Sequence, residues 1–211
     1  VTAVAMAAAW LAPGELRPSQ FKPIRRALDL PEAGVVATRP SLHGWVQVVD
    51  APALRPAPAV SLEFDGEIPQ QRAVFVNGLG HGSLLTPDAI RAPAWLEYTT
   101  DAAAFVAAIP HRVLLLENGP GGWAALAVRH GATRVTVVEP NRALVALLTE
   151  GVAPLAPEWR LPAVNCVVAD GRASLRRAQE TFDVGRALFD AGLLESDFGD
   201  PNRVRVLRPS P

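Results

Sequence analysis

Three short apolar runs, separated by segments of helical pattern, constrain the fold of this chain most strongly. They are RVLLLE (112–117), RVTVVE (134–139) and VNCVVAD (164–170). A continuous apolar run of this length, bounded by turn residues, is typical of a strand that is buried on both faces. The segments between them, 122–130 and 141–150, have helical composition, and each is followed by a glycine. The alternation predicts an α/β, Rossmann-like parallel sheet with FDVGRALF (182–189) as a fourth strand.

The residues before this sheet follow other patterns. Phe21, Ile24, Ala27 and Leu28 have helical spacing before Pro31, which predicts a short helix. Three stretches then have strand character: HGWVQVVD (43–50), AVSLEFDG (59–66) and AVFVNGLG (73–80). The last contains the turn dipeptide Asn77-Gly78. We expect a small antiparallel β-unit here, followed by a helix in DAAAFVAAI (101–109).

Three regions follow from these patterns. They are an apolar N-terminal segment with a lead-in helix (1–40), a small β-rich domain (41–98), and a Rossmann-like nucleoside-binding domain (99–211). The last region has room for about four strands, so we expect a truncated sheet whose fourth strand forms an edge. An open edge beside apolar surface tends to recruit another chain. We therefore expect a protein partner or a second copy to cover it.

Composition excludes several classes of function. The chain has 211 residues, 49% apolar and 19% charged, which supports a packed core. The net charge of −1 supplies no field that would attract nucleic acid, so no nucleic-acid partner is predicted. Cys166 is the only cysteine, which excludes an internal disulfide and a multi-cysteine metal site. The four histidines lack HxxxH or HxH spacing, so we predict surface or capping roles for them and no metal.

The N-terminal residues 1–13 (VTAVAMAAAWLAP) carry no charged side chain. This stretch is shorter than the roughly 20 residues that span a bilayer, and no basic flank of a signal peptide precedes it. Two interpretations stay open. Residues 1–13 begin a buried helix, or they are the last part of a membrane helix that begins upstream.

Candidate ligand-binding residues follow each of the three strands. The first strand ends in Glu117, and the Gly-rich loop with Gly119 and Gly121 leads into a helix. Glycines let the backbone approach a ligand closely, and a helix start offers unpaired N–H groups. Glu139, 22 residues after Glu117, is placed to accept hydrogen bonds from ribose hydroxyls. Asp170-Gly171 follows the third strand, beside the crevice where such sheets bind nucleotides.

Each of these features also has a purely structural interpretation. The glycines can form a tight strand-to-helix turn, and Glu139 can cap the helix that follows Pro140-Asn141. Asp170 can be an Asx-turn residue. The coincidence of three such features at three strand ends favours nucleoside binding.

The stretch HRVLLLENGPGGWAALAVRHGATRVTVVEPNRALVALL resembles the cofactor core of the spermidine synthase (aminopropyltransferase) family, which has the class I S-adenosylmethionine-dependent methyltransferase fold. SLHGWVQVVDAPALRPAPAVSLEFDG followed by FVNGLG resembles that family's N-terminal β-domain. It resembles especially bacterial spermidine synthase-like proteins whose catalytic-type domain follows membrane helices. The resemblance covers roughly residues 20–190. It implies a location in the cytoplasm or at the cytoplasmic face of a bacterial membrane, with residues 1–13 as a route to membrane association.

The resemblance also implies roles for the candidate residues. The ligand would be S-adenosylmethionine or decarboxylated S-adenosylmethionine. Gly119 and Gly121 would lie against its amino-acid portion, Glu139 would hold the ribose, and Asp170 with Gly171 would approach the adenine.

The sequence departs from the family pattern at two places. The family loop reads close to GGGDGG, whereas this chain has Glu117, Asn118 and Pro120 at three of those positions. The carboxylate of Glu117 would narrow the pocket or repel the carboxylate of the cofactor. The general-base aspartate expected after the fourth strand is Leu188, with Asp190 two residues on. An amine nucleophile must be deprotonated before it attacks, which Leu188 cannot do.

Three functions remain open. The first is a spermidine synthase-like protein that binds the nucleoside but has lost efficient aminopropyl transfer, in effect a pseudoenzyme. The second is a non-catalytic accessory subunit of a larger complex, and the third is a small-molecule methyltransferase, which can rely on positioning alone. In LEYTTD, Glu97, Tyr98 and Asp101 are candidates for a polyamine pocket, although solvated helix-start roles are favoured.

Overall fold

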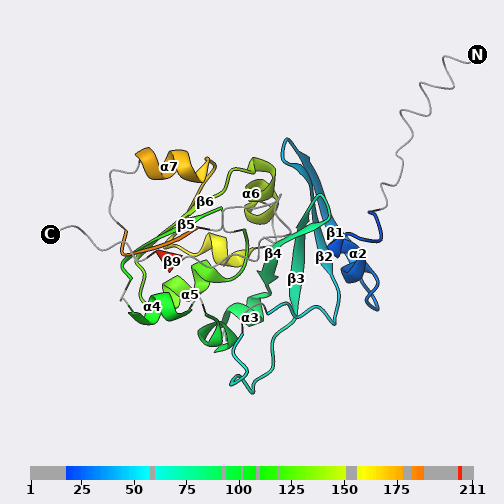
Figure 1. The fold of residues 1–211 in the computed structure, drawn as a ribbon, viewed down its shortest axis with the longest axis horizontal. Helices are drawn as coiled ribbons and strands as arrows, with labels where there is room; N and C mark the ends of the chain where they lie inside the picture. Colours follow the sequence, from blue (N-terminus) through cyan, green and yellow to red (C-terminus); the bar gives the residue numbers. More distant parts are fainter. Residues whose placement is uncertain are drawn as a thin grey trace, which may run out of the picture.

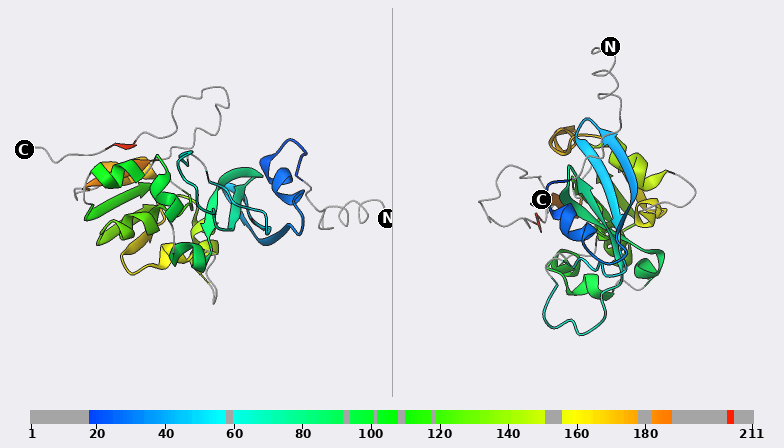
Figure 2. Two further views of the ribbon diagram at one scale, coloured as in Figure 1. Left: turned by 90° about the horizontal axis from the view of Figure 1, so that it is seen from below. Right: turned by 90° about the vertical axis from the view of Figure 1, so that its right-hand side faces the viewer.

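The fold consists of two β-sheets joined through one core, as the computed structural model in Figure 1 shows. The model describes residues 18–57, 60–91, 94–100, 102–107, 110–117, 119–150, 156–177, 182–187 and 204–205. One sheet is antiparallel, with four strands in the order β1-β2-β3-β4; the other has five strands in the order β7-β6-β5-β8-β9. Figure 2 shows α2 at the end of the antiparallel sheet that lies away from the parallel sheet.

The antiparallel strands are β1 (Gly34–Ser41), β2 (Gly44–Asp50), β3 (Gln71–Val76) and β4 (Leu79–Leu85). The second sheet consists of β5 (Arg112–Leu116), β6 (Arg134–Val138), β7 (Val164–Val167), β8 (Val184–Ala187) and β9 (Val204–Arg205). The α-helices are α2 (Pro23–Leu28), α3 (Pro87–Arg91), α4 (Ala102–Ala107), α5 (Trp123–Arg129), α6 (Arg142–Thr149) and α7 (Gly171–Arg177). Two 3₁₀ turns complete the set, η1 (Ala94–Tyr98) and η2 (Pro157–Arg160).

The predicted fold class is confirmed. Strands β5, β6, β7 and β8 are parallel, and helices connect them in the predicted order. The fourth strand is not the outermost one as expected, because β9 pairs with β8 in the antiparallel direction through Val204 and Arg205. A short strand from this same chain therefore occupies part of the edge that we had predicted to be open.

The antiparallel sheet differs from the prediction in two places. Of the predicted strand 59–66, the described residues 60–66 do not form a strand, and Val60 makes only an isolated bridge to Thr99. Strand β1 pairs with the outer edge of β2. It begins at Gly34, inside the segment 1–40 for which we predicted only an apolar N-terminal stretch and a lead-in helix. Strand β1 lies at the sheet edge and is half exposed, so its mixed composition and Pro40 are tolerated there.

One apolar cluster joins both sheets. It includes Val46, Val48 and Val74 of the antiparallel sheet together with Val113 and Val135 of the parallel sheet. Buried side chains of α4, α5 and α6 belong to the same cluster, so these helices cover one face of the parallel sheet. Helix α7 is on the side of the sheet away from α4 and α5 in Figure 1. The opposite face carries the separate, smaller cluster of Leu114, Leu116 and Val138.

Local signals set the helix ends around the parallel strands. The Asn141 side chain caps α6 by accepting hydrogen bonds from the backbone N–H groups of Ala143 and Leu144. Gly131, just past α5, has φ of 96° and ends that helix as predicted. Asp183 before β8 accepts from the backbone N–H groups of Arg112 and His111, which hold the pKa of its carboxyl below the usual value. These bonds tie the start of β5 to β8.

In the described ranges, no helix has the length and apolar character that crossing a membrane requires. Residues 1–13, the predicted route to a membrane, lie outside the described residues.

Glu158 of η2 is fully buried in this fold. Neither oxygen of its carboxyl reaches a hydrogen-bond partner elsewhere in the described part of the chain. Burial raises its pKa to about 8, an effect that its own backbone N–H partly offsets. Burial raises the pKa of the Cys166 thiol to about 11, and the charge of Glu158 adds to that effect. The Glu158 carboxyl is therefore protonated in the folded protein at neutral pH.

This burial predicts how stability changes with pH. Between pH 4.5 and about 8 the folded chain keeps a proton on Glu158 that the unfolded chain has released, so stability falls as pH rises through that window. The loss is on the order of 3 kcal/mol by pH 7. We expect Glu158→Gln to raise the free energy of unfolding at pH 7–8 and to have little effect near pH 4.5, measured by urea denaturation. The exposed Glu63→Gln is the control, and an equal effect of Glu158→Gln at both pH values would contradict this interpretation.

Candidate functional site

The candidate site lies at the carboxyl ends of β5, β6 and β7. Glu117 directly follows β5, Glu139 directly follows β6, and Asp170-Gly171 forms the junction between β7 and α7. These strands are neighbours and parallel, so their carboxyl ends share one edge of the sheet. The structure thus brings the predicted residues together, as the topology requires.

Glu117 spans the space between the first and third loops. Its Oε1 accepts a hydrogen bond of 2.7 Å from the backbone N–H of Gly171. A side chain at Gly171 would collide with this carboxylate, because its Cβ would lie 2.8 Å from Oε1. Glu117 also adopts φ of 49°, a left-handed backbone that residues other than glycine rarely occupy. The carboxylate that was expected to narrow a ligand pocket therefore bonds to the start of α7, after the third strand.

Glu139 is almost fully buried, and its two oxygens have different surroundings. Oε1 accepts a hydrogen bond of 2.9 Å from the backbone N–H of Asn141. Oε2 reaches no hydrogen-bond partner among the described residues. The cap of α6 is therefore the Asn141 side chain, and Glu139 holds the backbone N–H of that residue just before the helix. Oε2 of Glu139 stays available as an acceptor.

Asp170 caps α7. Its Oδ1 accepts from the backbone N–H of Ala173 at 2.7 Å, and the residue is exposed. This is the local hydrogen bond that the turn interpretation predicted. The adjoining Gly171 is buried and bonded to Glu117. An approach of Asp170 or Gly171 to an adenine ring stays a prediction.

The Gly-rich loop packs against strand β4. The backbone N–H of Ser83 donates to the carbonyl of Pro120, and a Cβ at Gly82 would lie 2.0 Å from that carbonyl oxygen. A Cβ at Gly119, where φ is 56°, would lie 2.3 Å from the carbonyl oxygen of His81. The indole of Trp123 folds back over Gly121. The glycines thus accommodate the protein's own strand and indole.

His81 is a site residue that sequence reasoning missed. We had counted it among scattered histidines with surface or capping roles, yet its Nε2 is buried 3.8 Å from Oε2 of Glu139. It comes from the antiparallel sheet, far from Glu139 in the chain. The only sequence signal was its position between two glycines in GLGHG, which marks an irregular strand and identifies no partner.

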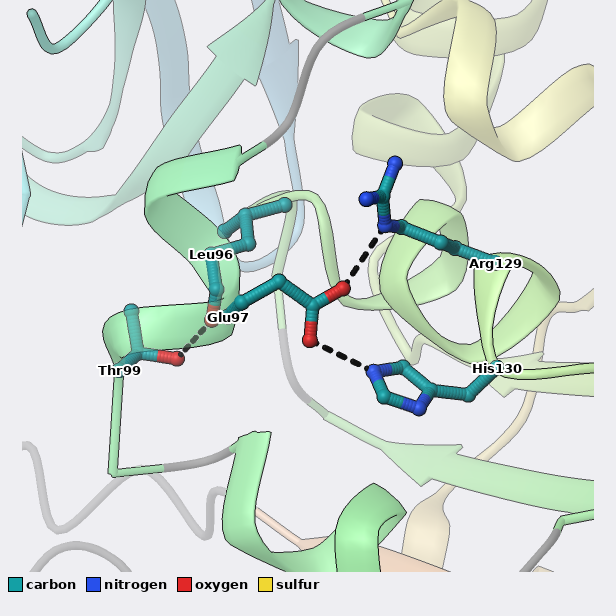
Figure 3. A network of polar contacts seen from close by, with 5 residues as sticks. All are labelled: Leu96, Glu97, Thr99, Arg129 and His130. Atoms are coloured by element: carbon teal, nitrogen blue, oxygen red, sulfur yellow. Dashed lines mark hydrogen bonds and ion pairs between the residues drawn. The ribbon is translucent and has the colours of Figure 1, made fainter. Parts of the chain in front are cut away.

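The other candidates lie elsewhere or outside the described residues. Both oxygens of Glu97 contact the end of α5 at 2.8 Å, one bound to Nε of Arg129 and the other to Nε2 of His130 (Figure 3). Glu97 therefore joins η1 to α5, and Tyr98 beside it is about half exposed. Asp101, Leu188 and Asp190 lie outside the described residues. Within the described ranges, no three potential metal-ligating side chains gather.

Comparison with solved structures identifies the fold. A spermidine synthase in complex with the transition-state analogue AdoDATO matches with a TM-score of 0.50 and 16% sequence identity, over 72% of this chain and 46% of that chain. The chain has a spermidine synthase-like fold. A spermidine synthase from Thermotoga maritima aligns over 72% of this chain and 45% of its own, with a TM-score of 0.46 and 15% identity. No family model and no curated protein sequence matches.

The extent of the spermidine synthase-like match bears on function. This chain spans less than half the length of either spermidine synthase. At 16% identity the likeness establishes the fold and leaves the activity open.

The contact between the loop and β4 generates a stability prediction. Gly119→Ala places a methyl group against the His81 carbonyl at a left-handed φ, so we expect a loss of roughly 1–3 kcal/mol in the free energy of unfolding. Gly80→Ala is the matched control, because Gly80 lies on the same strand as His81 and a Cβ there meets nothing within 4 Å. Thermal denaturation of both variants measures the difference. Equal melting temperatures would show that β4 does not press on the loop.

Proposed function

We propose that the chain is a spermidine synthase-like protein that binds an adenosine-type nucleoside, S-adenosylmethionine or its decarboxylated form, without efficient aminopropyl transfer. The observation that carries this proposal is the buried Oε2 of Glu139 at the end of β6, which has no hydrogen-bond partner among the described residues. A buried carboxylate oxygen without a hydrogen bond is costly, and an incoming hydroxyl would satisfy it. A ribose provides such a hydroxyl at this position of a doubly wound sheet.

The second part of the proposal rests on the sequence. The position where the family pattern has its general base is Leu188, which lies outside the described residues. The acidic side chains of the site do not replace a base. Glu117 and Asp170 accept hydrogen bonds from backbone N–H groups, which hold each side chain in place. An amine nucleophile would remain protonated at neutral pH.

Isothermal titration calorimetry tests the binding. We expect S-adenosylmethionine, its decarboxylated form or methylthioadenosine to bind, and Glu139→Gln to weaken that binding by about tenfold or more. The amide keeps an oxygen for the Asn141 N–H and replaces Oε2 by a group that cannot accept a hydrogen bond. Glu63→Gln, the same change at an exposed residue outside the candidate site, is the control.

Two outcomes would overturn the proposal. Absence of heat with all three ligands at millimolar concentration contradicts nucleoside binding. Ready turnover of decarboxylated S-adenosylmethionine with putrescine contradicts the loss of transfer.

We propose as a second candidate a non-catalytic interaction module in which the chain itself fills the crevice. The observation that favours it is the hydrogen bond from Gly171 to Glu117, which crosses the crevice from the third loop to the first. In this case the fold would persist as a surface for a protein partner or a second copy.

Glu117→Gly separates the two candidates. Glycine accepts the φ of 49° without strain and removes the carboxylate that crosses the crevice. If the crevice is filled internally, the original chain binds no methylthioadenosine and Glu117→Gly does, by calorimetry. Glu117→Gln is the control, since its amide oxygen still accepts from Gly171. Equal binding by all three proteins would contradict a blocking role for Glu117.

A further inference from the structure

We propose that His81, contributed by the antiparallel sheet, is a ligand-positioning residue that binds one nucleoside hydroxyl jointly with Glu139. This inference rests on the proposed nucleoside binding and names a second, unassigned side of that site. Three features of the described residues carry it: an irregularity in β4, the shape of the Gly119 loop, and the surroundings of two buried polar atoms.

The first feature is a β-bulge at His81. In the pairing of β3 with β4, Val74 faces Gly82 and Phe75 faces Gly80, so His81 is the additional residue without a partner on β3. A bulge interrupts the alternation of side chains and turns the additional residue in a new direction. Gly82 beside it has φ of 141°, a backbone that other residues rarely adopt. The bulge therefore directs the His81 side chain away from the antiparallel sheet.

The second feature is the space above Gly119. A Cβ on Gly119 would lie 3.3 Å from Cδ2 and 3.4 Å from Nε2 of His81. The imidazole thus lies directly over this glycine, and the loop after β5 leaves room for the ring to approach Glu139. The glycine that was assigned to a cofactor also admits a side chain from the other sheet.

The third feature is the pair of polar atoms themselves. Nε2 of His81 and Oε2 of Glu139 are both buried, and neither has a hydrogen-bond partner among the described residues. They are 3.8 Å apart, too far for a direct hydrogen bond. The bond from the Asn141 N–H to Oε1 fixes the Glu139 carboxylate, so the direction of Oε2 is fixed as well.

One hydroxyl group satisfies both atoms. An oxygen about 2.8 Å from each can donate its hydrogen to Oε2 and accept from the N–H of His81 in the tautomer protonated at Nε2. Because Glu139 stands at the end of β6, where doubly wound sheets hold a ribose, the hydroxyl is one of the two on a ribose. Nucleoside binding would then need both sheets.

Calorimetry with adenosine, 2′-deoxyadenosine and 3′-deoxyadenosine tests this assignment. We expect the full chain to bind one deoxynucleoside about tenfold more weakly than adenosine. His81→Ala should weaken adenosine binding by about tenfold and abolish the difference between adenosine and that deoxynucleoside. His81→Gln, which keeps an N–H donor, should restore most of the difference. His43→Ala, at an exposed histidine of the β1–β2 turn, is the control.

The outcomes separate this inference from the proposed function. If His81→Ala binds adenosine as tightly as the original chain, the inference is wrong and nucleoside binding stands. If His81→Ala weakens all three ligands equally, His81 only supports the fold and the inference is also wrong. If the original chain binds none of the three, the proposed function fails, and the assignment of His81 fails with it.

Discussion

The contact between β4 and the Gly-rich loop is the constraint on which the rest of the structure depends. The bond from Ser83 to Pro120 and the close approach at Gly82 and Gly119 leave no space for side chains between the two backbones. Backbones that approach this closely need glycines, since any Cβ would separate the sheets. This contact lets one apolar cluster run through both sheets, and it brings His81 to the strand ends.

The acidic residues of the site differ in the hydrogen bonds and the burial of their carboxylate oxygens. Glu117 and Asp170 accept from backbone N–H groups at 2.7 Å each, so their charges are compensated within the protein. Oε1 of Glu139 also accepts a hydrogen bond from a backbone N–H, whereas Oε2 has no hydrogen-bond partner among the described residues. Of the three residues at the strand ends, Glu139 therefore remains the best candidate to bind a ligand. By the same criterion, Glu158 is a core acid whose carboxyl has no hydrogen-bond partner elsewhere in the described residues, and burial keeps it neutral.

Inferences about the fold and about any activity of this protein rest on different kinds of observation. The strand order, the helix positions and the match to a spermidine synthase concern the backbone, which many unrelated functions share. Activity depends on a few side chains, and the proposed loss of transfer rests on Glu117 and Leu188, where the sequence differs from the pattern it resembles. The hydrogen bond from Gly171 to Glu117 joins the loop after β7 to the end of β5.

The sequence alone determined the parallel sheet, because buried strands and capped helices carry local signals such as RVLLLE, Asn141 and Gly131. It also placed Glu117, Glu139 and Asp170 at one edge, since parallel strands align their carboxyl ends. The extent of the antiparallel sheet could not be predicted from the sequence. The pairing of edge strand β1 and the absence of residues 60–66 from the sheet both depend on distant segments. Tertiary structure alone decided which acid is satisfied and brought His81 to Glu139, because those contacts join residues that no local pattern connects.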